Sequence, residues 1–231
     1  MSSYINQLFF GIYPYIAIAV FVIGSLLRYE HVPYGWRSGS SQFLSKPKMR
    51  WASNLFHIGI IVILGGHLVG LLTPKEVYHI FITSSQKQVL AMTAGGIAGV
   101  ACFIGLTMLI IRRFTDPLVK ATSSFSDNLV LIILYIQLIL GLMTIFISMG
   151  HLDGETMVDF GNWAQSIVTL NGKAASYVAD KNIIFKLHIV LGLTILLIFP
   201  FTRLVHVWSV PISYITTRKG YQIVRKKEKS E

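Results

Sequence analysis

Five long stretches of this chain carry almost no charged side chain, and they constrain its fold more than any other feature. Four contain no Asp, Glu, Lys or Arg, and the fifth carries only Lys186 and Arg203. A helix that crosses a bilayer needs roughly 20 mostly apolar residues, because the hydrocarbon core is about 30 Å thick. Lipid cannot satisfy free backbone groups, so each stretch is predicted to be a helix. The predicted spans are 5–27, 51–74, 88–111, 128–150 and 183–208.

The composition supports the same interpretation. Of the 231 residues, 53% are hydrophobic and 13% are charged, whereas soluble domains carry about 25% charged residues. The sequence therefore predicts an all-α integral membrane protein, a five-helix bundle in a single domain over 1–215. A basic cytoplasmic tail is expected at 216–231. The outer loop 151–182 is longer than a plain connector, and a short interfacial helix is expected there, with Trp163 at headgroup depth.

The distribution of basic residues predicts the orientation of the chain. With the N-terminus outside, the inner segments are 28–50, 112–127 and the tail from Arg203, and they hold fifteen of the twenty Lys and Arg residues. Basic residues favour the cytoplasmic side, so the C-terminus is expected in the cytoplasm. We expect the first span to be retained, because no basic residue precedes it and it lacks a small-residue cleavage site.

The net charge of +10 does not indicate a nucleic-acid-binding protein. The basic residues lie in loops and a tail beside predicted membrane spans, where they define topology and contact anionic lipid. Docking of a cytoplasmic partner is a second use that such a surface allows.

Four of the seven histidines lie inside predicted spans, where ionisable side chains are costly and mark function. His57 and His67 lie on the second span, and His188 and His206 lie on the fifth. These spans run in opposite directions, so His57 matches His206 in depth near the cytoplasm, and His67 matches His188 in the outer half. A b-type haem needs one imidazole on each side of its iron. The two pairs therefore predict two haems, held without covalent attachment because a C-x-x-C-H motif is absent.

The spacing of the histidines differs between the two spans. His57 and His67 are ten residues apart, or about 15 Å of helix rise, whereas His188 and His206 are eighteen apart, or about 27 Å. Tilted helices or haems and a kink at Pro200 would reconcile the two intervals. For any one histidine, a hydrogen bond to a neighbouring helix is the alternative interpretation.

Other residues fit two interpretations, a role in a functional site and a role in helix packing. Arg203 could pair with a haem propionate or could extend to the membrane surface. Gly66 and Gly192 could leave room for a macrocycle edge or for close helix packing. A zinc protease motif is absent, and so are the intramembrane carboxylates that a proton-coupled transporter typically needs. The solitary Cys102 and the loop histidines His31, His79 and His151 need no special role.

The sequence around the intramembrane histidines resembles the gamma subunit of bacterial respiratory nitrate reductase. The resemblance covers about residues 5–215. The matching segments are 12–17, 52–59, 66–67, 72–74, 94–96, 163–166, 187–188 and 203–211.

That family is a dihaem cytochrome b of the bacterial cell membrane. It anchors a cytoplasmic iron–sulfur (beta) subunit and a molybdenum catalytic (alpha) subunit in anaerobic respiration. The resemblance implies that His67 and His188 hold a distal haem b, and that His57 and His206 hold a proximal haem b. It also implies that Lys87 and Gly66 line a site where quinol, menaquinol or ubiquinol, is oxidised on the outer side with proton release there.

Two alternatives have the same membrane character. A cytochrome b anchor of a formate dehydrogenase or hydrogenase would use the same haems with another partner. A haem-free membrane transporter or scaffold would carry no haem at all. An absorption spectrum separates the second alternative from the other interpretations.

Overall fold

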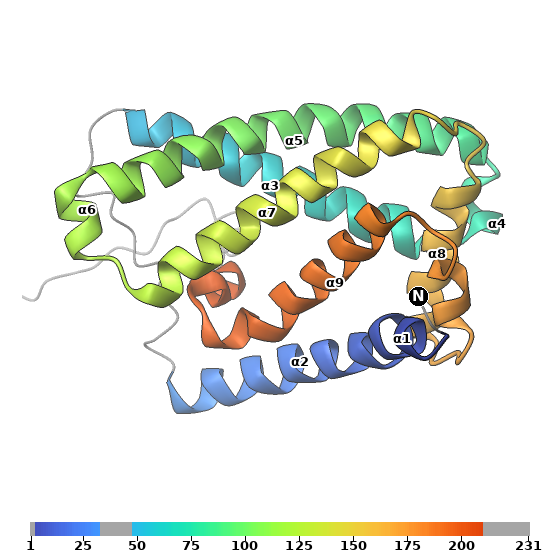
Figure 1. Ribbon diagram of the computed structural model, residues 1–231, viewed down its shortest axis with the longest axis horizontal. Coiled ribbons are helices and arrows are strands. Elements are labelled where there is room, and N and C mark those ends of the chain that lie inside the picture. Colours follow the sequence, from blue (N-terminus) through green and yellow to red (C-terminus); the bar gives the residue numbers. More distant parts are fainter. Residues whose placement is uncertain (1–2, 33–47, 210–231) are drawn as a thin grey trace, which may run out of the picture.

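The computed structural model describes residues 3–32 and 48–209, and within these residues it is helical with no strand. Five helices are long and apolar enough to cross a membrane, which confirms the all-α, five-span prediction. They run lengthwise through the molecule (Figure 1). The five spans are built on α2 (Tyr13–His31), α3 (Lys48–Leu72), α5 (Ser84–Thr115), α7 (Phe125–Ser148) and α9 (Ile183–Ile198), and the first and last also include the helical turns next to α2 and α9.

The starts of α5 and α7 are set by capping boxes. Thr83 accepts from the backbone N–H of Gln86 at 3.2 Å, and the Gln86 side chain accepts from the N–H of Thr83 at 2.9 Å. Ser124 and Asp127 make the same exchange at the start of α7. Each box satisfies N–H groups that a helix leaves free at its start, so α5 begins four residues before its predicted span. The short α6 (Pro117–Ala121) connects the two helices.

Glycines let α3 and α5 pack with their backbones almost in contact. A Cβ added at Gly59 would lie 2.7 Å from Cβ of Cys102, and one at Gly105 would lie 2.5 Å from the Phe56 nitrogen. Cys102 is fully buried at this contact. A Cβ added at Gly99 would lie 2.8 Å from Cδ2 of Leu142, on α7. Close packing of α3, α5 and α7 therefore depends on these small residues.

One end of the bundle is covered by α8 (Glu155–Val168), together with the 3-10 turn η4 (Ala174–Val178) and the short α4 (Lys75–Tyr78) (Figure 1). The expected helix in the outer loop is present. Trp163, however, is only 8% exposed, and its indole N–H donates to the Phe10 carbonyl at 3.0 Å. Phe10 lies in the π-helical turn η1 (Leu8–Ile12), which follows α1 (Ser3–Gln7). The side chain of Trp163 therefore packs inside the protein, and its expected place at headgroup depth stays a prediction.

The last span ends earlier than predicted. The helix α9 stops at Ile198, a 3-10 turn η5 (Phe199–Phe201) contains Pro200, and Thr202 is extended with φ −120° and ψ 177°. A second 3-10 segment, η6 (Arg203–Ser209), then carries His206. Proline lacks an N–H group and clashes with the preceding turn, so the helix breaks where a kink was expected. A single helix over 183–208 is therefore wrong, and the interval from His188 to His206 does not run along one axis.

The predicted tail at 216–231 and part of the inner loop lie outside the described residues. The membrane orientation and the single domain over 1–215 stay predictions.

Candidate functional site

The rings of His67 on α3 and His188 on α9 lie next to each other, with centroids 6.1 Å apart and planes inclined by 41°. His67 is five residues before the end of α3, and His188 is five residues after the start of α9. Both therefore lie toward the end of the bundle covered by α8 (Figure 1). The structure thus brings together the two side chains that antiparallel topology predicts to share a depth.

The separation of these rings suits two imidazoles on one iron. A metal–imidazole nitrogen bond is about 2 Å long, so two opposed rings on one metal have centroids about 6 Å apart. Within the described residues, no three His, Cys, Asp or Glu side chains converge. A structural zinc site requires four protein ligands, whereas haem brings four nitrogens of its own and needs only two imidazoles. The residues present therefore fit a haem better than a bare metal ion.

In three of the histidines, a hydrogen bond to the backbone favours the tautomer that can bind a metal through Nε2. The Nδ1 atom lies 2.7 Å from the Ser53 carbonyl oxygen in His57 and 2.8 Å from the Ile63 carbonyl oxygen in His67, and in His206 it contacts the carbonyl of Arg203. A carbonyl can only accept, so Nδ1 must donate. In a neutral imidazole the lone pair then lies on Nε2, which is the arrangement of metal-bound histidines.

His188 is held differently, by α7. Its Nδ1 atom is buried without a hydrogen-bond partner among the described residues. A Cβ at Gly141 would lie 3.0 Å from the His188 Cε1, so the ring packs directly on the α7 backbone. The Gln137 amide donates to the His188 carbonyl at 3.1 Å. Sequence reasoning missed Gln137 and Gly141, although an amide in the middle of a membrane span is a visible signal.

The inner histidines are not in contact. No ring contact or hydrogen bond joins His57 to His206 among the residues that the structure describes. His57 is exposed on α3, and His206 is half-buried on η6. The break at Pro200 separates His206 from the α9 axis, so its position depends on contacts of η6 with other helices. The roles of all four histidines as haem ligands stay predictions.

Arg203 has a protein partner at the start of α7. Its Nε atom lies 2.7 Å from Oδ1 of Asp127, at the start of α7. The ion pair joins η6 to α7. A contact between Arg203 and a haem propionate stays a prediction. Gly192, on α9, is close to the Gln137 amide, with 3.2 Å from an added Cβ to Nε2, so helix packing explains it.

Lys87 and Gly66 lie toward the end of the bundle that α8 covers. The Lys87 ammonium lies 3.7 Å from the centroid of the Tyr78 ring, a cation–π contact. The packing of Gly59 on Cys102 sets the antiparallel register of α3 and α5. That register places Lys87 level with residue 74, just past the end of α3 and about 10 Å along the helix axis beyond His67. A Cβ added at Gly66 would meet nothing within 4 Å. The surface of α3 beside His67 is therefore not covered by other described residues.

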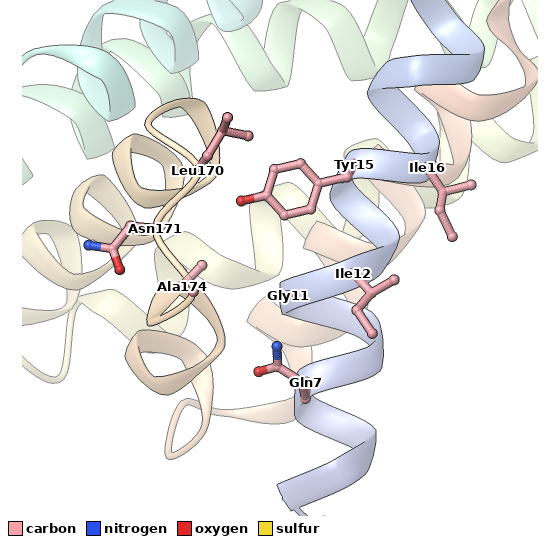
Figure 2. Close-up of a pocket in the computed structure, with 9 residues that line it drawn as sticks. Gln7, Gly11, Ile12, Tyr15, Ile16, Leu170, Asn171 and Ala174 are labelled. Atoms are coloured by element: carbon pink, nitrogen blue, oxygen red, sulfur yellow. The ribbon is translucent and has the colours of Figure 1, made fainter.

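A pocket of about 450 Å³ lies elsewhere, between η1 and the segment that follows α8 (Figure 2). Figure 2 shows the Tyr15 ring pointing across it toward Leu170, with the Gln7 amide beside Gly11. None of the predicted site residues lines this pocket. It is therefore separate from the histidine pair.

The fold and the pair together describe a multi-pass membrane protein in which two histidine rings lie next to each other between the second and fifth spans. Residues 6–227 match the family described as the nitrate reductase gamma subunit. The respiratory nitrate reductase 1 gamma chain of Escherichia coli (strain K12) is 50% identical over 223 residues, which cover 96% of this chain and 98% of that relative. The nitrate reductase gamma chain of Bacillus subtilis (strain 168) is 36% identical over 96% of this chain and 99% of that relative. The chain belongs to the nitrate reductase gamma subunit family, which confirms the resemblance.

Proposed function

We propose that this chain is the membrane subunit of a quinol-dependent respiratory nitrate reductase in the bacterial cell membrane. Family membership supports the assignment to such a complex. The observation that carries the cofactor assignment is the His67–His188 ring pair, with its 6.1 Å centroid separation. In this proposal His67 and His188 hold a distal haem b, and His57 and His206 hold a proximal haem b. When bound, the haems supply one-electron transfer between the two sides of the membrane.

In this proposal, the protein keeps the Nε2 atoms of the histidines available as ligands and excludes water from them. The carbonyls of Ser53 and Ile63 keep Nδ1 of His57 and His67 protonated, so that Nε2 is available without a change of tautomer. Gly141 limits where the His188 ring can lie. The long apolar spans surround these side chains with lipid and with each other, which lowers the local dielectric.

Quinol is proposed to bind at the end of the bundle near Lys87 and Gly66. A quinol that loses two electrons also releases two protons, and these are proposed to leave on the outer side. The Lys87 ammonium can donate a hydrogen bond to a quinol oxygen. Tyr78 holds it over an aromatic ring instead of leaving it in solvent. The open helix surface at Gly66 leaves space for an apolar ring beside His67.

The proposed partners are a cytoplasmic iron–sulfur (beta) subunit and a molybdenum catalytic (alpha) subunit. Electrons pass inward to these subunits, and nitrate is reduced on the alpha subunit. The proposed orientation places the N-terminus outside and the inner basic segments on the partner side. Inward electron flow with outward proton release would support the membrane potential, at about 2.3 kcal/mol per charge per 100 mV.

The test begins with the chain purified from membranes through a tag. A dithionite-reduced b-type spectrum with about two haems per chain is expected, together with co-purified subunits that reduce nitrate with quinol. His67→Gln should remove one haem signal, whereas His151→Gln, at an exposed loop histidine, should leave both. A colourless preparation of the native chain contradicts the haem assignment. A coloured chain that brings down a formate dehydrogenase or hydrogenase contradicts the nitrate assignment alone.

A further inference from the structure

One face of α2 contacts the broken C-terminal segment at three successive positions. The Phe21 ring lies 4.9 Å from the Phe199 ring and 5.7 Å from the Trp208 ring, measured between centroids. A Cβ added at Gly24 would lie 2.9 Å from Cβ and Cγ of Pro200. One turn further, Nη1 of Arg28 donates to the Pro200 carbonyl at 2.6 Å and to the Thr202 carbonyl at 2.8 Å. Residues 21, 24 and 28 follow helical spacing, so they form one continuous surface.

This surface satisfies the groups that the break leaves free. A helix leaves its last carbonyls unpaired, and an unpaired carbonyl is costly where lipid replaces water. Pro200 is fully buried, so bulk water does not reach its ring. The Arg28 guanidinium supplies charge-assisted hydrogen bonds to two of the carbonyls. Thr202 donates to the Phe199 carbonyl at 3.0 Å and accepts from the Leu204 N–H at 3.3 Å, which starts η6.

The place of η6 therefore depends on α2 and α7. Arg28 holds the residues that precede η6, and the ion pair of Arg203 with Asp127 attaches its first residue to α7. Val205 is fully buried, directly before His206 in the chain. Because η6 no longer continues the α9 helix, the contacts of Arg28 and Arg203 hold the start of the segment that carries His206.

We propose that Arg28, seated with Gly24, is a positioning residue for the proximal histidine His206. The proposal rests on the proposed function, in which His206 is a haem ligand. Arg28 acts on the backbone of Pro200 and Thr202 and sets where the His206 imidazole lies relative to α3. Removing its hydrogen bonds should therefore disturb the proximal haem and leave the distal haem unchanged, since His67 and His188 are held by α3, α7 and α9.

The experiment uses the complete nitrate reductase complex in its native membranes. The variants are Arg28→Ala, Arg28→Lys and Gly24→Val, with Leu26→Ala as a matched control on an α2 side chain that is 62% exposed. Electron paramagnetic resonance of the oxidised membranes resolves the low-spin haem signals, and His206→Gln and His67→Gln identify the proximal and distal signals. The pyridine haemochrome assay gives haem per chain.

Arg28→Ala should shift or remove the signal that His206→Gln removes, so that haem per chain falls from about two toward about one. Gly24→Val should act in the same direction, because its side chain displaces Pro200. Arg28→Lys should restore part of the signal, since an ammonium can reach one carbonyl but lacks the planar fork. Leu26→Ala should match the native protein.

Two results would overturn the inference alone. The first is an unchanged proximal signal in Arg28→Ala. The second is an equal loss of both haem signals accompanied by a loss of the protein itself from the membranes, which would indicate a general folding role for Arg28. A native complex without low-spin haem signals would instead refute the proposed function, and this inference with it.

Discussion

Gln165 of α8 donates its side-chain amide to the backbone carbonyl of Leu71 at 3.1 Å, so the cap at one end of the bundle is bonded to the last turn of the helix that carries His67. The same amide nitrogen lies 3.4 Å from the Thr73 carbonyl. Two residues earlier, Trp163 bonds the carbonyl of Phe10 on the first span. The cap therefore joins the first two membrane spans to each other, through residues that lie about 90 and 150 positions away from them in the sequence.

We expect Gln165→Leu to destabilise the end of α3 next to His67. The substitution leaves the partly buried Leu71 and Thr73 carbonyls without their donor, at a cost of about 1 kcal/mol. The measurement is the thermal midpoint of the distal haem absorbance in detergent, which should fall. Val168→Ala, at an exposed position of α8, serves as the control and should not change the midpoint. Equal midpoints for Gln165→Leu and the native chain would contradict the prediction.

Trp163→Phe removes one hydrogen-bond donor and keeps an aromatic ring in the core. The Phe10 carbonyl would lose its partner, and stability should fall by about 1–3 kcal/mol. Thermal unfolding followed by intrinsic fluorescence in detergent measures the change. Trp51→Phe, on a largely exposed side chain of α3, should have a much smaller effect. An equal loss of stability in both variants would show that the hydrogen bond from Trp163 to Phe10 does not stabilise the packing of α8 on the bundle.

Gly141→Ala should alter the distal haem selectively. Its Cβ would lie 3.0 Å from Cε1 of His188, so the ring or α7 must shift. We expect a changed low-spin signal for the distal haem and an unchanged proximal signal, measured by electron paramagnetic resonance. Gly172→Ala, where an added Cβ meets nothing within 4 Å, is the matched control. A distal signal identical to that of the native protein would show that α7 does not hold the ring.

Lys87→Ala should slow the reduction of both haems by quinol and leave their spectra intact. Loss of one hydrogen bond from a charged donor costs about 1.5–3 kcal/mol, so kcat/KM for quinol should fall roughly tenfold or more. Stopped-flow reduction by a soluble quinol measures this. Lys173→Ala removes an exposed lysine between α8 and η4 and should have no effect. Loss of haem in Lys87→Ala would place Lys87 in the scaffold and not in the quinol site.

The Lys181–Asp159 ion pair predicts a pH dependence of stability. Their charged atoms lie 2.6 Å apart. Partial burial lowers the pKa of Lys181, but the hydrogen bond and charge of Asp159, with Asp180, outweigh it and raise the pKa above its ordinary value of 10.5. Because the folded pKa is raised, the stabilisation is complete below the unfolded pKa and is lost as pH rises through the folded pKa.

Asp159→Asn should therefore lower the thermal midpoint at neutral pH, by the equivalent of about 0.2–1 kcal/mol after screening by solvent. The difference from the native chain should shrink as pH rises above 10.5, the ordinary pKa of Lys181. Glu155→Gln, at an exposed acidic residue on the first turn of α8, is the control for charge alone. A difference that grows with pH would show the opposite sign of linkage and would rule out the ion pair as its source.

Hydropathy and histidine placement predict the spans and the matched depths of His67 and His188, because both follow from local composition and antiparallel topology. The end of α9 could not be predicted in the same way. Residues 203–208 remain largely apolar, and proline in a membrane helix can produce either a kink or a break. The break depends on Gly24 and Arg28, which lie more than 170 residues earlier. The roles of Trp163, Gln137 and Gly141 likewise arise from contacts between distant segments, which periodicity does not encode.

The arrangement of the histidines also governs biogenesis. Each proposed pair takes one imidazole from α3 and the other from α9 or η6, near opposite ends of the polypeptide. Neither pair exists while the ribosome is still translating the intervening spans. In the proposed assignment, the distal pair is complete once α9 has been inserted, whereas the proximal pair also needs η6 to dock. A chain truncated before residue 206 should therefore reach the membrane with the distal pair but without the proximal one.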